Sequence, residues 1–474
     1  MTDELKSGED DRTSEHQLSA FSAGAIVAAS MIGAGVYITS GFTLADLGSP
    51  FQVVFAWAIG GVIAICGAIC YGALAQKFTE SGGEYLFLAR AVHPAAGMMA
   101  GWVSMIAGFA GAMAFAATTF EEYLRVSQWP PLASIPEGSF AVFLVVVAAV
   151  VHGIGLRPGT RIQNFVVIFK FILVGLFILI ALVDFPNWQG GARVVSGGGE
   201  PSEVWTWAHL FVFANALTWI SLSYSGFNAA VYMTGEIKNP QRDVPRAMLG
   251  ATVGVTVIYV VLNGVFVFAP PADEVTGNPN IATAAASAIG NQMMSNGFAM
   301  GHYVGPLVWI AILAGLVTSV FALTQTGPRV YHKMASDGLL PKFLAGHLTS
   351  SDEAVGLNLR PAIFTQAVLG CLFIGIASLR EQLNYLGFTL SVCAALCGAL
   401  VFVVHKRDEP LLPHWAFPLV PIIYVFGTLM IATLTAIRVP VQAAVGLGTL
   451  SLGVIAYWLT RLLWGSRASN DRRN

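Results

Sequence analysis

Two apolar stretches of this 474-residue chain are interrupted near their centres by glycine and small polar residues. Gly33-Ala34-Gly35 interrupts the first stretch and Ser225-Gly226 interrupts the second. Glycine costs about 1 kcal/mol relative to alanine inside a helix, so each cluster favours a break. A broken helix leaves carbonyls unpaired where one half ends and N–H groups unpaired where the next half begins. This chemistry predicts a site for a solute that carries both a carboxylate and an ammonium.

A third chemically unusual residue is Lys170, which lies inside the apolar stretch 162–183. At 1.5 Å per residue it is about 12 Å along the helix axis, close to the middle of a bilayer core about 30 Å thick. A lysine at that depth costs roughly 2.5 to 3.5 kcal/mol on insertion scales, which favours a functional role. The alternative is that its ammonium extends to the membrane surface while its stem stays apolar.

The composition indicates a membrane protein. Of the residues, 55% are hydrophobic and 11% are charged, whereas soluble domains carry about 25% charged residues. The net charge of −2 gives no reason to expect nucleic acid as a partner. Residues 1–19 are acidic and polar rather than a signal peptide, and they predict a disordered cytoplasmic tail. Residues 464–474 predict a second cytoplasmic tail.

A helix needs about 20 apolar residues to cross a bilayer, and that length predicts twelve spans. Continuous apolar runs favour helices over the alternating pattern of a barrel. The expected fold is therefore an all-α polytopic membrane protein. The spans are predicted at 21–42, 51–74, 95–120, 140–156, 162–183, 210–233, 248–269, 304–326, 361–379, 386–404, 419–437 and 445–463.

The basic residues predict the orientation. If the N-terminus lies inside, the inner segments carry 19 of the 24 Lys and Arg residues, the outer segments carry four, and Lys170 accounts for the last. Because basic residues are retained on the cytoplasmic side, both termini are predicted to be cytoplasmic. Two outer loops are long, and the alanine-rich run 281–289 in one of them is equally compatible with a small helix or a plain loop.

Other motifs argue against enzymatic and metal chemistry. The five cysteines lie in apolar stretches without metal-ligand spacing, so we expect packing roles, no disulfide framework and no metal. Neither H-E-x-x-H nor G-x-S-x-G occurs, SGGG at 196–199 lacks the lysine of a P-loop, and no cofactor is expected. Polar pore-lining stripes typical of a channel are also missing. Matching breaks in two halves are instead typical of a secondary transporter.

Several separated blocks resemble the amino acid-polyamine-organocation (APC) superfamily, specifically its bacterial amino acid permeases. The resemblance extends from about Leu18 to Leu463. The blocks are MIGAGVY in the first span, ESGGEYLFLARA at 80–91, GLRPGTRIQN at 155–164, YSGFNAAVYMTGEIKNPQRDVPRA at 224–247 and GPRVYHKMASDGLLPKFL at 327–344.

The resemblance implies two inverted five-helix repeats followed by two further helices. The first repeat is spans 1–5 (20–183), the second is spans 6–10 (210–404), and spans 11–12 cover 419–463. Helices 1 and 6 are discontinuous in this fold. The resemblance also implies the plasma membrane, which is the inner membrane of a bacterium, as the location, with the lipid bilayer and an amino acid as the partners; protein partners are not predicted.

The resemblance also implies which groups bind the substrate. The carboxylate side falls on the N–H groups of Gly33, Ala34 and Gly35. The ammonium side falls on carbonyls around both breaks, and Gly226 and Asn228 complete the expected substrate site. The carbonyls belong to Met31, Ile32, Leu222, Ser223 and Ser225. Tyr37 and Phe227 are candidate gate or pocket residues, although plain packing is the alternative for both.

Lys170 takes on a sharper role by the same resemblance. In several members without sodium dependence, a lysine in span 5 occupies the place of a sodium ion, and Thr318 and Ser319 match the region that would supply hydroxyl ligands. Lys170 is then either a fixed cation or a group that loses and regains a proton. Two departures stand out: Ala34 replaces a frequent serine, and Ala73 replaces a frequent glutamate.

The predicted activity is secondary active transport of amino acids by proton-coupled symport or by exchange. Spans 1, 2, 6, 8 and 10 contain no Asp or Glu in their central turns, which favours a neutral substrate. A cationic amino acid or a polyamine is the alternative if Glu122 reaches inward. An amino-acid sensor built on a transporter fold would keep the same breaks. The motif 237–242 and the Asp337-Gly338 turn are candidate inner-gate elements or merely capped, positively charged loops.

Overall fold

Long apolar helices make up the computed structural model, which describes residues 18–126, 134–154, 156–185, 188, 207–346, 358–407 and 411–470. The first part of the chain forms α2 (Ala20–Met31), α3 (Gly35–Leu47), α4 (Pro50–Lys77), α5 (Gly83–Ala91), α6 (Pro94–Val103), the π-helix η1 (Ser104–Gly111), α7 (Ala112–Val126), α8 (Ser139–Ile154) and α9 (Leu156–Val183).

The second part of the chain repeats this pattern of long helices joined by short ones. It forms α10 (Trp207–Ser223), the 3₁₀-helix η4 (Ala229–Glu236), α11 (Pro240–Phe268), α12 (Ala272–Val275), α13 (Ile281–Ser295), η5 (Ala299–Tyr303), α14 (Val304–Ser336), η6 (Lys342–Ala345), α15 (Arg360–Ile376), α16 (Leu379–Arg407), α17 (Leu419–Arg438) and α18 (Pro440–Asn470).

The membrane character of the chain is confirmed by these helices. Within the described residues, eight helices are long and apolar enough to cross a bilayer, or nine if α2 and α3, which are bent by 42°, form one span. Three shorter apolar helices, Ser139–Ile154, His209–Ser223 and Arg360–Ile376, lie where spans 4, 6 and 9 were predicted. The total of twelve spans and the cytoplasmic location of both termini stay predictions.

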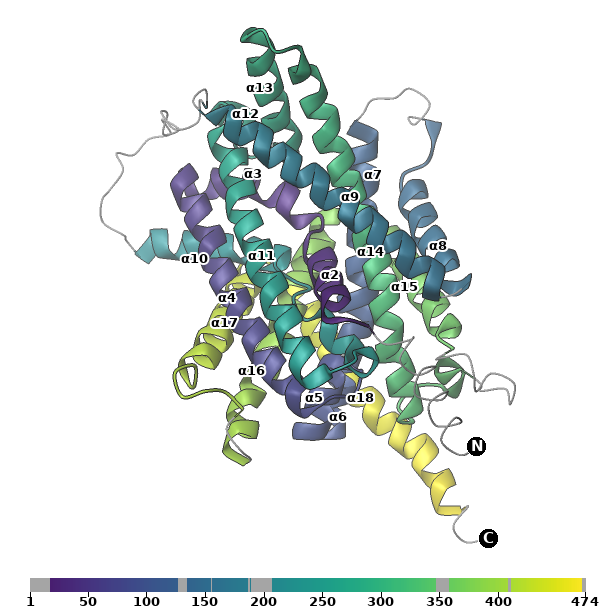
Figure 1. Cartoon of the computed structure of the whole chain (residues 1–474). Coiled ribbons are helices and arrows are strands. Elements are labelled where there is room, and N and C mark those ends of the chain that lie inside the picture. The colour runs from purple at the N-terminus through teal and green to yellow at the C-terminus, as the bar shows by residue number, and fades with distance from the viewer. Residues whose placement is uncertain are drawn as a thin grey trace, which may run out of the picture.

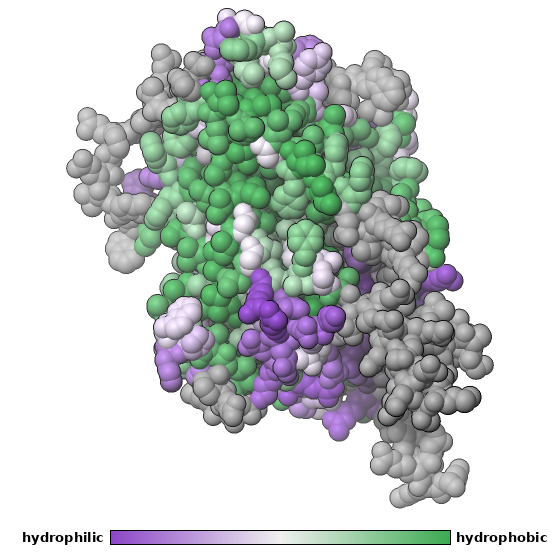
Figure 2. Space-filling model, viewed as in Figure 1, coloured by the Kyte–Doolittle hydropathy of each residue, from purple (hydrophilic) through white to green (hydrophobic). Residues whose placement is uncertain are grey.

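Most of the long helices run side by side, with α13 at one end of the molecule and α5 and α6 at the other, whereas α10 lies across them (Figure 1). We call these ends the α13 face and the α5 face. Figure 2 shows an apolar surface around the middle of the molecule and hydrophilic residues gathered at the α5 face. Large apolar side chains such as Phe165, Val183 and Ile376 are exposed on this surface, as expected where lipid rather than water is the solvent.

Local sequence signals explain several helix ends near the breaks. Ser19 caps α2 by accepting the N–H of Ser22 at 3.1 Å. Gly48 ends α3 in the left-handed conformation (φ 67°) and donates its N–H to the carbonyl of Leu44. Proline begins α4, because the first turn of a helix does not need that N–H.

Aromatic packing holds the helices behind the breaks. The rings of Trp57, Tyr224 and Tyr259 lie with centroids 5.1 to 5.7 Å apart. The indole N–H of Trp57 donates to Ser40 at 2.8 Å, and the Ser40 hydroxyl donates to Asn263 at 2.6 Å. These contacts join α3, α4 and α11 and leave the buried polar groups satisfied.

The two broken helices run antiparallel. The half after the first break, α3, packs on the half before the second break, α10, and α2 packs on η4. This arrangement agrees with inverted repeats at 20–183 and 210–404, although the repeat boundaries stay predictions. Because both breaks lie at the same level, their backbone groups meet in one place.

The structure corrects three details of the predictions. The predicted break in span 6 is present, since α10 ends at Ser223 and Gly226 has φ 101°, but the chain continues after it as the 3₁₀-helix η4 rather than as an α-helix to 233. The predicted tail 1–19 is ordered at its end, where Leu18 pairs with Ile237; residues 1–17 lie outside the described residues. The predicted tail 464–474 begins as helix, since α18 extends to Asn470.

The run 281–289 is helical, as part of α13. That settles the choice between a helix and a plain loop. The glycine run at 196–199 lies outside the described residues.

Candidate functional site

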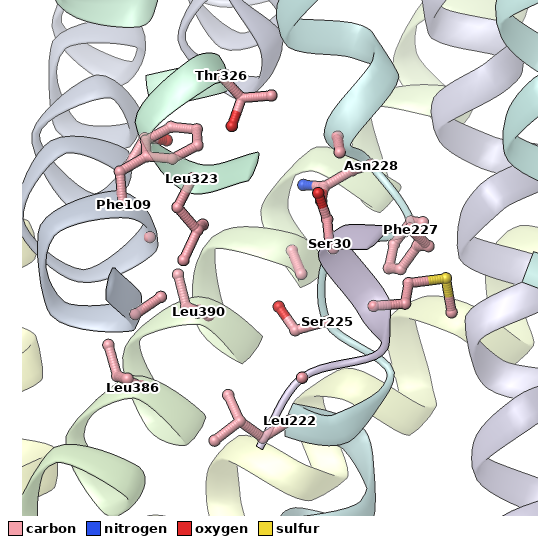
Figure 3. Close-up of a pocket in the computed structure, with 18 of the residues that line it drawn as sticks. Ser30, Phe109, Leu222, Ser225, Phe227, Asn228, Leu323, Thr326, Leu386 and Leu390 are labelled. Carbon is pink, nitrogen blue, oxygen red and sulfur yellow. The ribbon is translucent and has the colours of Figure 1, made fainter. Parts of the chain in front are cut away.

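A cavity of about 150 Å³ lies at the level of the two breaks. It is lined by both breaks together with parts of α4, α5, the segment from α6 to α7, α14, α16 and α17. In Figure 3, Phe109, Leu323 and Leu390 lie on one side of the cavity, opposite Ser30, Ser225 and Asn228. The cavity therefore has a mostly apolar wall facing a wall of backbone and small polar side chains.

The lining includes most of the predicted substrate-binding residues. They are Met31, Gly33, Ala34, Gly35, Leu222, Ser223, Ser225, Gly226 and Asn228, together with the candidate gate residue Phe227 and with Ser319. Ile32, Tyr37, Lys170 and Thr318 lie behind this surface and do not line the cavity. Direct contact of any of these residues with a substrate stays a prediction.

The break in span 1 opens between Met31 and Gly35. The first two N–H groups of α3, those of Gly35 and Val36, have no acceptor within their own helix and can bind an anion, whereas the N–H of Tyr37 donates to the carbonyl of Ala34 at 3.1 Å. The N–H of Gly33, which we expected to be free, donates to the carbonyl of Met31 at 2.8 Å in a three-residue turn. Fewer N–H groups of this break are therefore free to bind an anion than the sequence implied.

The carbonyls of the span 1 break are engaged by side chains of other helices. The Tyr259 hydroxyl lies 2.6 Å from the Met31 oxygen and 3.1 Å from the Ser223 oxygen. These carbonyls belong to different breaks, and the hydroxyl can donate its proton to either of them. The Ile32 oxygen accepts the Lys170 ammonium at 3.2 Å and the Ser319 hydroxyl at 3.4 Å. We expected the Ile32 carbonyl to face the substrate, but in this structure it faces Lys170.

The break in span 6 needs glycine for a steric reason. At Gly226 φ is 101°, and a Cβ atom there would lie 2.8 Å from the carbonyl carbon and oxygen of Ser30. Similarly, a Cβ on Gly35 would lie 3.0 Å from the Cα of Ser223. A glycine of each break therefore packs against the backbone of the other break, and this close approach brings the backbone groups of the two breaks together.

Lys170 is fully buried on α9. Its ammonium donates to the Thr318 hydroxyl at 2.9 Å as well as to Ile32. The structure thus brings Lys170, Thr318 and Ser319 together behind the span 1 break. The extended conformation in which the ammonium reaches the membrane surface is not adopted.

The two aromatic candidates differ in position. The Phe227 ring lines the cavity and packs edge-on against the rings of Tyr71 (5.4 Å) and Tyr424 (6.1 Å). Tyr37 is buried within α3, and its carbonyl accepts the Tyr123 hydroxyl at 3.2 Å. Its own hydroxyl has no hydrogen-bond partner among the described residues. Phe227 can thus shape the pocket, whereas Tyr37 has a packing position.

The cavity contains an acid that the sequence reasoning missed. Glu84, near the start of α5, is 8% exposed and lines the cavity. Its Oε1 accepts Asn228 Nδ2 at 2.8 Å and the Tyr71 hydroxyl at 3.0 Å; its Oε2 accepts the Ser104 hydroxyl at 3.1 Å and the Tyr232 hydroxyl. The absence of acids from the central turns of the spans therefore does not make the cavity free of acids.

The reason for this miss is that only acids inside the spans were considered, and Glu84 lies between two spans. A local signal was present: Glu84 follows Gly82 and Gly83, which have φ values of 147° and 57°. These glycines let the chain turn back into the bundle, and Gly83 packs directly against the Tyr232 ring. Burial raises the pKa of Glu84, while the hydrogen bonds from Tyr232, Tyr71, Ser104 and Asn228 act in the opposite direction.

Glu122, the acid considered from the sequence, lies elsewhere. Its side chain is exposed on α7 and lines a separate cavity of about 260 Å³ nearer the α13 face. That cavity also touches Gly35 and Thr39. Glu122 therefore does not reach the cavity that contains Glu84.

Ion pairs link neighbouring elements at the α5 face. Arg329 of α14 pairs with Glu236 of η4, with one N–O distance of 2.7 Å. Lys333 pairs with Glu80 at 2.8 Å, and the hydrogen bond from Lys333 lowers the pKa of Glu80. The Tyr85 hydroxyl donates to Asp337 at 2.6 Å, so the predicted inner-gate turn does contact α5.

The His, Cys, Asp and Glu side chains of the described residues are dispersed. No three His, Cys, Asp or Glu side chains there are arranged to hold an ion. All five cysteines are free thiols. The polar groups at the cavity are instead backbone amides, hydroxyls, the Asn228 side-chain amide and one acid, which suit reversible binding rather than bond-making chemistry.

Comparisons with known proteins agree with this geometry. The family model for amino acid permeases matches residues 18–459. The chain is 24% identical to the large neutral amino acids transporter small subunit 2 of Homo sapiens over 446 residues, which cover 92% of this chain and 79% of that protein. It is also 24% identical to the b(0,+)-type amino acid transporter 1 of Mus musculus over 392 residues, which cover 81% of this chain and 75% of that protein.

The family match extends over nearly the whole chain, including both breaks and every element that lines the cavity. The many apolar helices and the buried cavity at the level of the breaks agree with it. The chain belongs to the amino acid permease family and is a multi-pass membrane transporter of amino acids, not an enzyme.

Proposed function

We propose that this protein is a secondary active transporter whose substrates are neutral amino acids. The observation that carries the proposal is the contact between the two breaks, where Gly226 lies against Ser30 and Gly35 lies against Ser223 beside one cavity. A substrate carboxylate binds the N–H groups at the start of α3, and its ammonium binds carbonyls at the end of α10. The side chain extends toward the apolar wall formed by Phe109, Leu323 and Leu390.

A neutral substrate is favoured by two observations. The wall opposite the breaks is mostly apolar, and Glu84 already accepts four hydrogen bonds from neutral donors. A carboxylate has about four lone-pair positions, so a cationic side chain would have to displace one of these donors. The name of the human relative, which refers to large neutral amino acids, points the same way.

The proposed cation of the site is Lys170. Its ammonium holds the carbonyl of Ile32 and the hydroxyl of Thr318, which are oxygen ligands of the kind a sodium ion takes. Transport is accordingly independent of sodium and works by proton-coupled symport or by exchange. The proposed location is the plasma membrane, the inner membrane in a bacterium, with both termini cytoplasmic.

The test is uptake by purified protein in liposomes, with a panel of labelled amino acids and with sodium and proton gradients imposed separately. We expect saturable uptake or counterflow of neutral amino acids without sodium. Uptake that requires sodium would overturn the role of Lys170. Absence of both flux and counterflow, combined with retained binding, would indicate a sensor instead of a transporter.

A second candidate substrate class follows from Glu84, because a buried acid beside the cavity also suits a cationic amino acid or a polyamine. The same liposomes distinguish the two classes. Strong competition by arginine or a diamine, with weak competition by leucine, would favour the cationic class.

A further inference from the structure

We propose that Glu84 is a proton-binding site linked to the substrate site, so that the transporter carries a proton together with its amino acid. This inference rests on the proposed transport function and assigns its coupling ion to a residue. It differs from a proton-cycling role for Lys170, which lies behind the other break.

The first step is the missing counter-charge. No Lys, Arg or His side chain within the described residues forms a salt bridge with Glu84. The titratable groups that face it are Tyr71 of α4, Tyr232 of η4, Tyr424 of α17, and Cys393 and Cys397 of α16. A buried charge without an opposite partner is costly, and the simplest way to remove that cost is to bind a proton.

Basic residues near α5 are committed to other acids. On α14, which packs against α5, Arg329 pairs with Glu236, and Lys333 pairs with Glu80 and Asp337. On α5 itself, Arg90 pairs with Glu80. The helix α6, which packs most closely against α5, contains no ionisable side chain. Glu84 is therefore separated from the network of charges at the α5 face.

The second step is that both charge states have a defined hydrogen-bond arrangement. As an anion, Glu84 accepts from four donors and lies in the first turn of α5, where the helix dipole favours negative charge. Asn228 Nδ2 also donates to the Tyr232 hydroxyl at 3.3 Å, so Tyr232 is oriented to donate to Glu84. As a neutral acid, Glu84 carries a donor of its own, and at least one of the four contacts must reverse or break.

The third step connects this change to the substrate. Asn228 and Tyr232 belong to the segment that follows the span 6 break, and Asn228 is only two residues from Gly226. Gly226 in turn packs against Ser30 at the break in span 1. A shift of η4 when substrate binds therefore changes the donors to Glu84. By thermodynamic reciprocity, proton binding must then change the affinity for substrate.

The proton balance of the cycle is simple. The Glu84 carboxylate takes one proton from the solution on the side where substrate enters the cavity, which gives a neutral carboxylic acid. It releases the same proton to the solution on the other side when substrate leaves. Since Glu84 and Asn228 line the cavity, water in the cavity can deliver and remove the proton.

The test compares wild type with Glu84→Gln in liposomes loaded at one pH and diluted into another. With one proton per substrate, a pH difference of one unit drives about tenfold accumulation of labelled amino acid. We expect wild type to accumulate substrate when the outside is acidic. Glu84→Gln is expected to equilibrate substrate without accumulation while it retains counterflow at symmetric pH. The control is Glu274→Gln, an exposed acid on α12, which should behave as wild type.

A second measurement follows protons directly with a pH-sensitive dye inside the liposomes. Substrate added outside should acidify the interior of wild-type vesicles but not of Glu84→Gln vesicles. If Glu84→Gln does not fold, Glu84→Asp keeps a titratable carboxyl one methylene shorter, and its gradient response should persist with a shifted pH dependence.

The outcomes separate the two levels of the proposal. Wild-type counterflow without substrate-driven proton entry would overturn the role of Glu84 and leave the transport function intact. Gradient-driven accumulation by Glu84→Gln equal to wild type would also overturn it. If wild type shows neither flux nor counterflow, the transport function fails and this inference fails with it.

Discussion

The two breaks are stabilised by opposite chemistry. At the break in span 1 an α-helix ends, so carbonyl oxygens are left over, and a buried cation, Lys170, donates to one of them. At the break in span 6 the helix α10 also ends in carbonyls, but the residues that follow the break supply side-chain donors, Asn228 and Tyr232, to a buried acid, Glu84. Each break is thus contacted by one buried ionisable residue, a base at span 1 and an acid at span 6.

The difference suggests a division of roles. Lys170 lies behind the cavity wall, where its ammonium donates to Ile32 and Thr318, whereas Glu84 lines the cavity. A charge sealed behind the wall suits a fixed structural cation. A charge at the wall suits a group that titrates during transport. The following predictions test this comparison, from the largest expected effect to the smallest.

Gly226→Ala should abolish measurable transport. Alanine at φ 101° is strained by about 1 to 3 kcal/mol, and its Cβ would also meet the Ser30 backbone at 2.8 Å. Uptake in liposomes measures the effect, and thermal unfolding checks that the protein is intact. Gly375→Ala is the control, because that α15 glycine has open space around it. Normal transport by Gly226→Ala would contradict the close contact between the breaks.

Lys170→Ala should lower kcat/KM for uptake roughly tenfold or more, since a hydrogen bond from a charged donor contributes about 1.5 to 3 kcal/mol. If Lys170 is a fixed cation, the remaining flux should still respond to a pH gradient, unlike that of Glu84→Gln. Lys342→Ala, at an exposed lysine, is the control. Unchanged kinetics and unchanged pH dependence would eliminate a role for Lys170.

Thr318→Val should raise KM about tenfold, because one of the two hydrogen bonds of the buried ammonium, worth at least about 1.5 kcal/mol, is lost. Ser319→Ala should have a smaller effect, since its hydroxyl is 3.4 Å from the Ile32 oxygen, whereas Thr318 is 2.9 Å from the ammonium. Concentration series of initial uptake rates measure both. An effect of Ser319→Ala larger than that of Thr318→Val would reverse the assigned order of ligands.

Asn228→Ala should change the rate least, about threefold, because cavity water can replace one donor. It should nevertheless move the pH dependence. Removal of a donor to the anion raises the pKa of Glu84 further, so the protonated form persists to higher pH and the gradient response shifts to higher pH. Uptake measured across a pH series tests the direction. A shift to lower pH would show that Asn228 stabilises the neutral acid instead.

Much of the site was predictable because it depends on local properties. Gly33, Gly35 and Gly226 weaken a helix wherever they occur in its interior, and a helix end exposes the same backbone groups in any fold. Lys170 was conspicuous because a charge within an apolar run is rare and costly. The break positions and the depth of Lys170 therefore followed from periodicity and residue type alone.

Other features depended on contacts between distant parts of the chain. The partners of Glu84 lie 13, 20, 144 and 148 positions away, and no local pattern brings them together. The use of the Ile32 carbonyl by Lys170, 138 positions away, was also hidden. Sequence placed Glu84 in a loop between spans, and only its packing against Tyr232 turned it toward the cavity.

The sequence by itself thus determined the class of the molecule, the weak points of its helices and the presence of a buried cation. These follow from hydrophobicity, glycine content and backbone dipoles, which act over one or two helical turns. Only the tertiary structure decided which unpaired groups face the cavity, which are already bonded within the protein, and that an acid shares the site. Hydrogen bonds act over about 3 Å of space regardless of separation along the chain, so folding had to bring these groups together first.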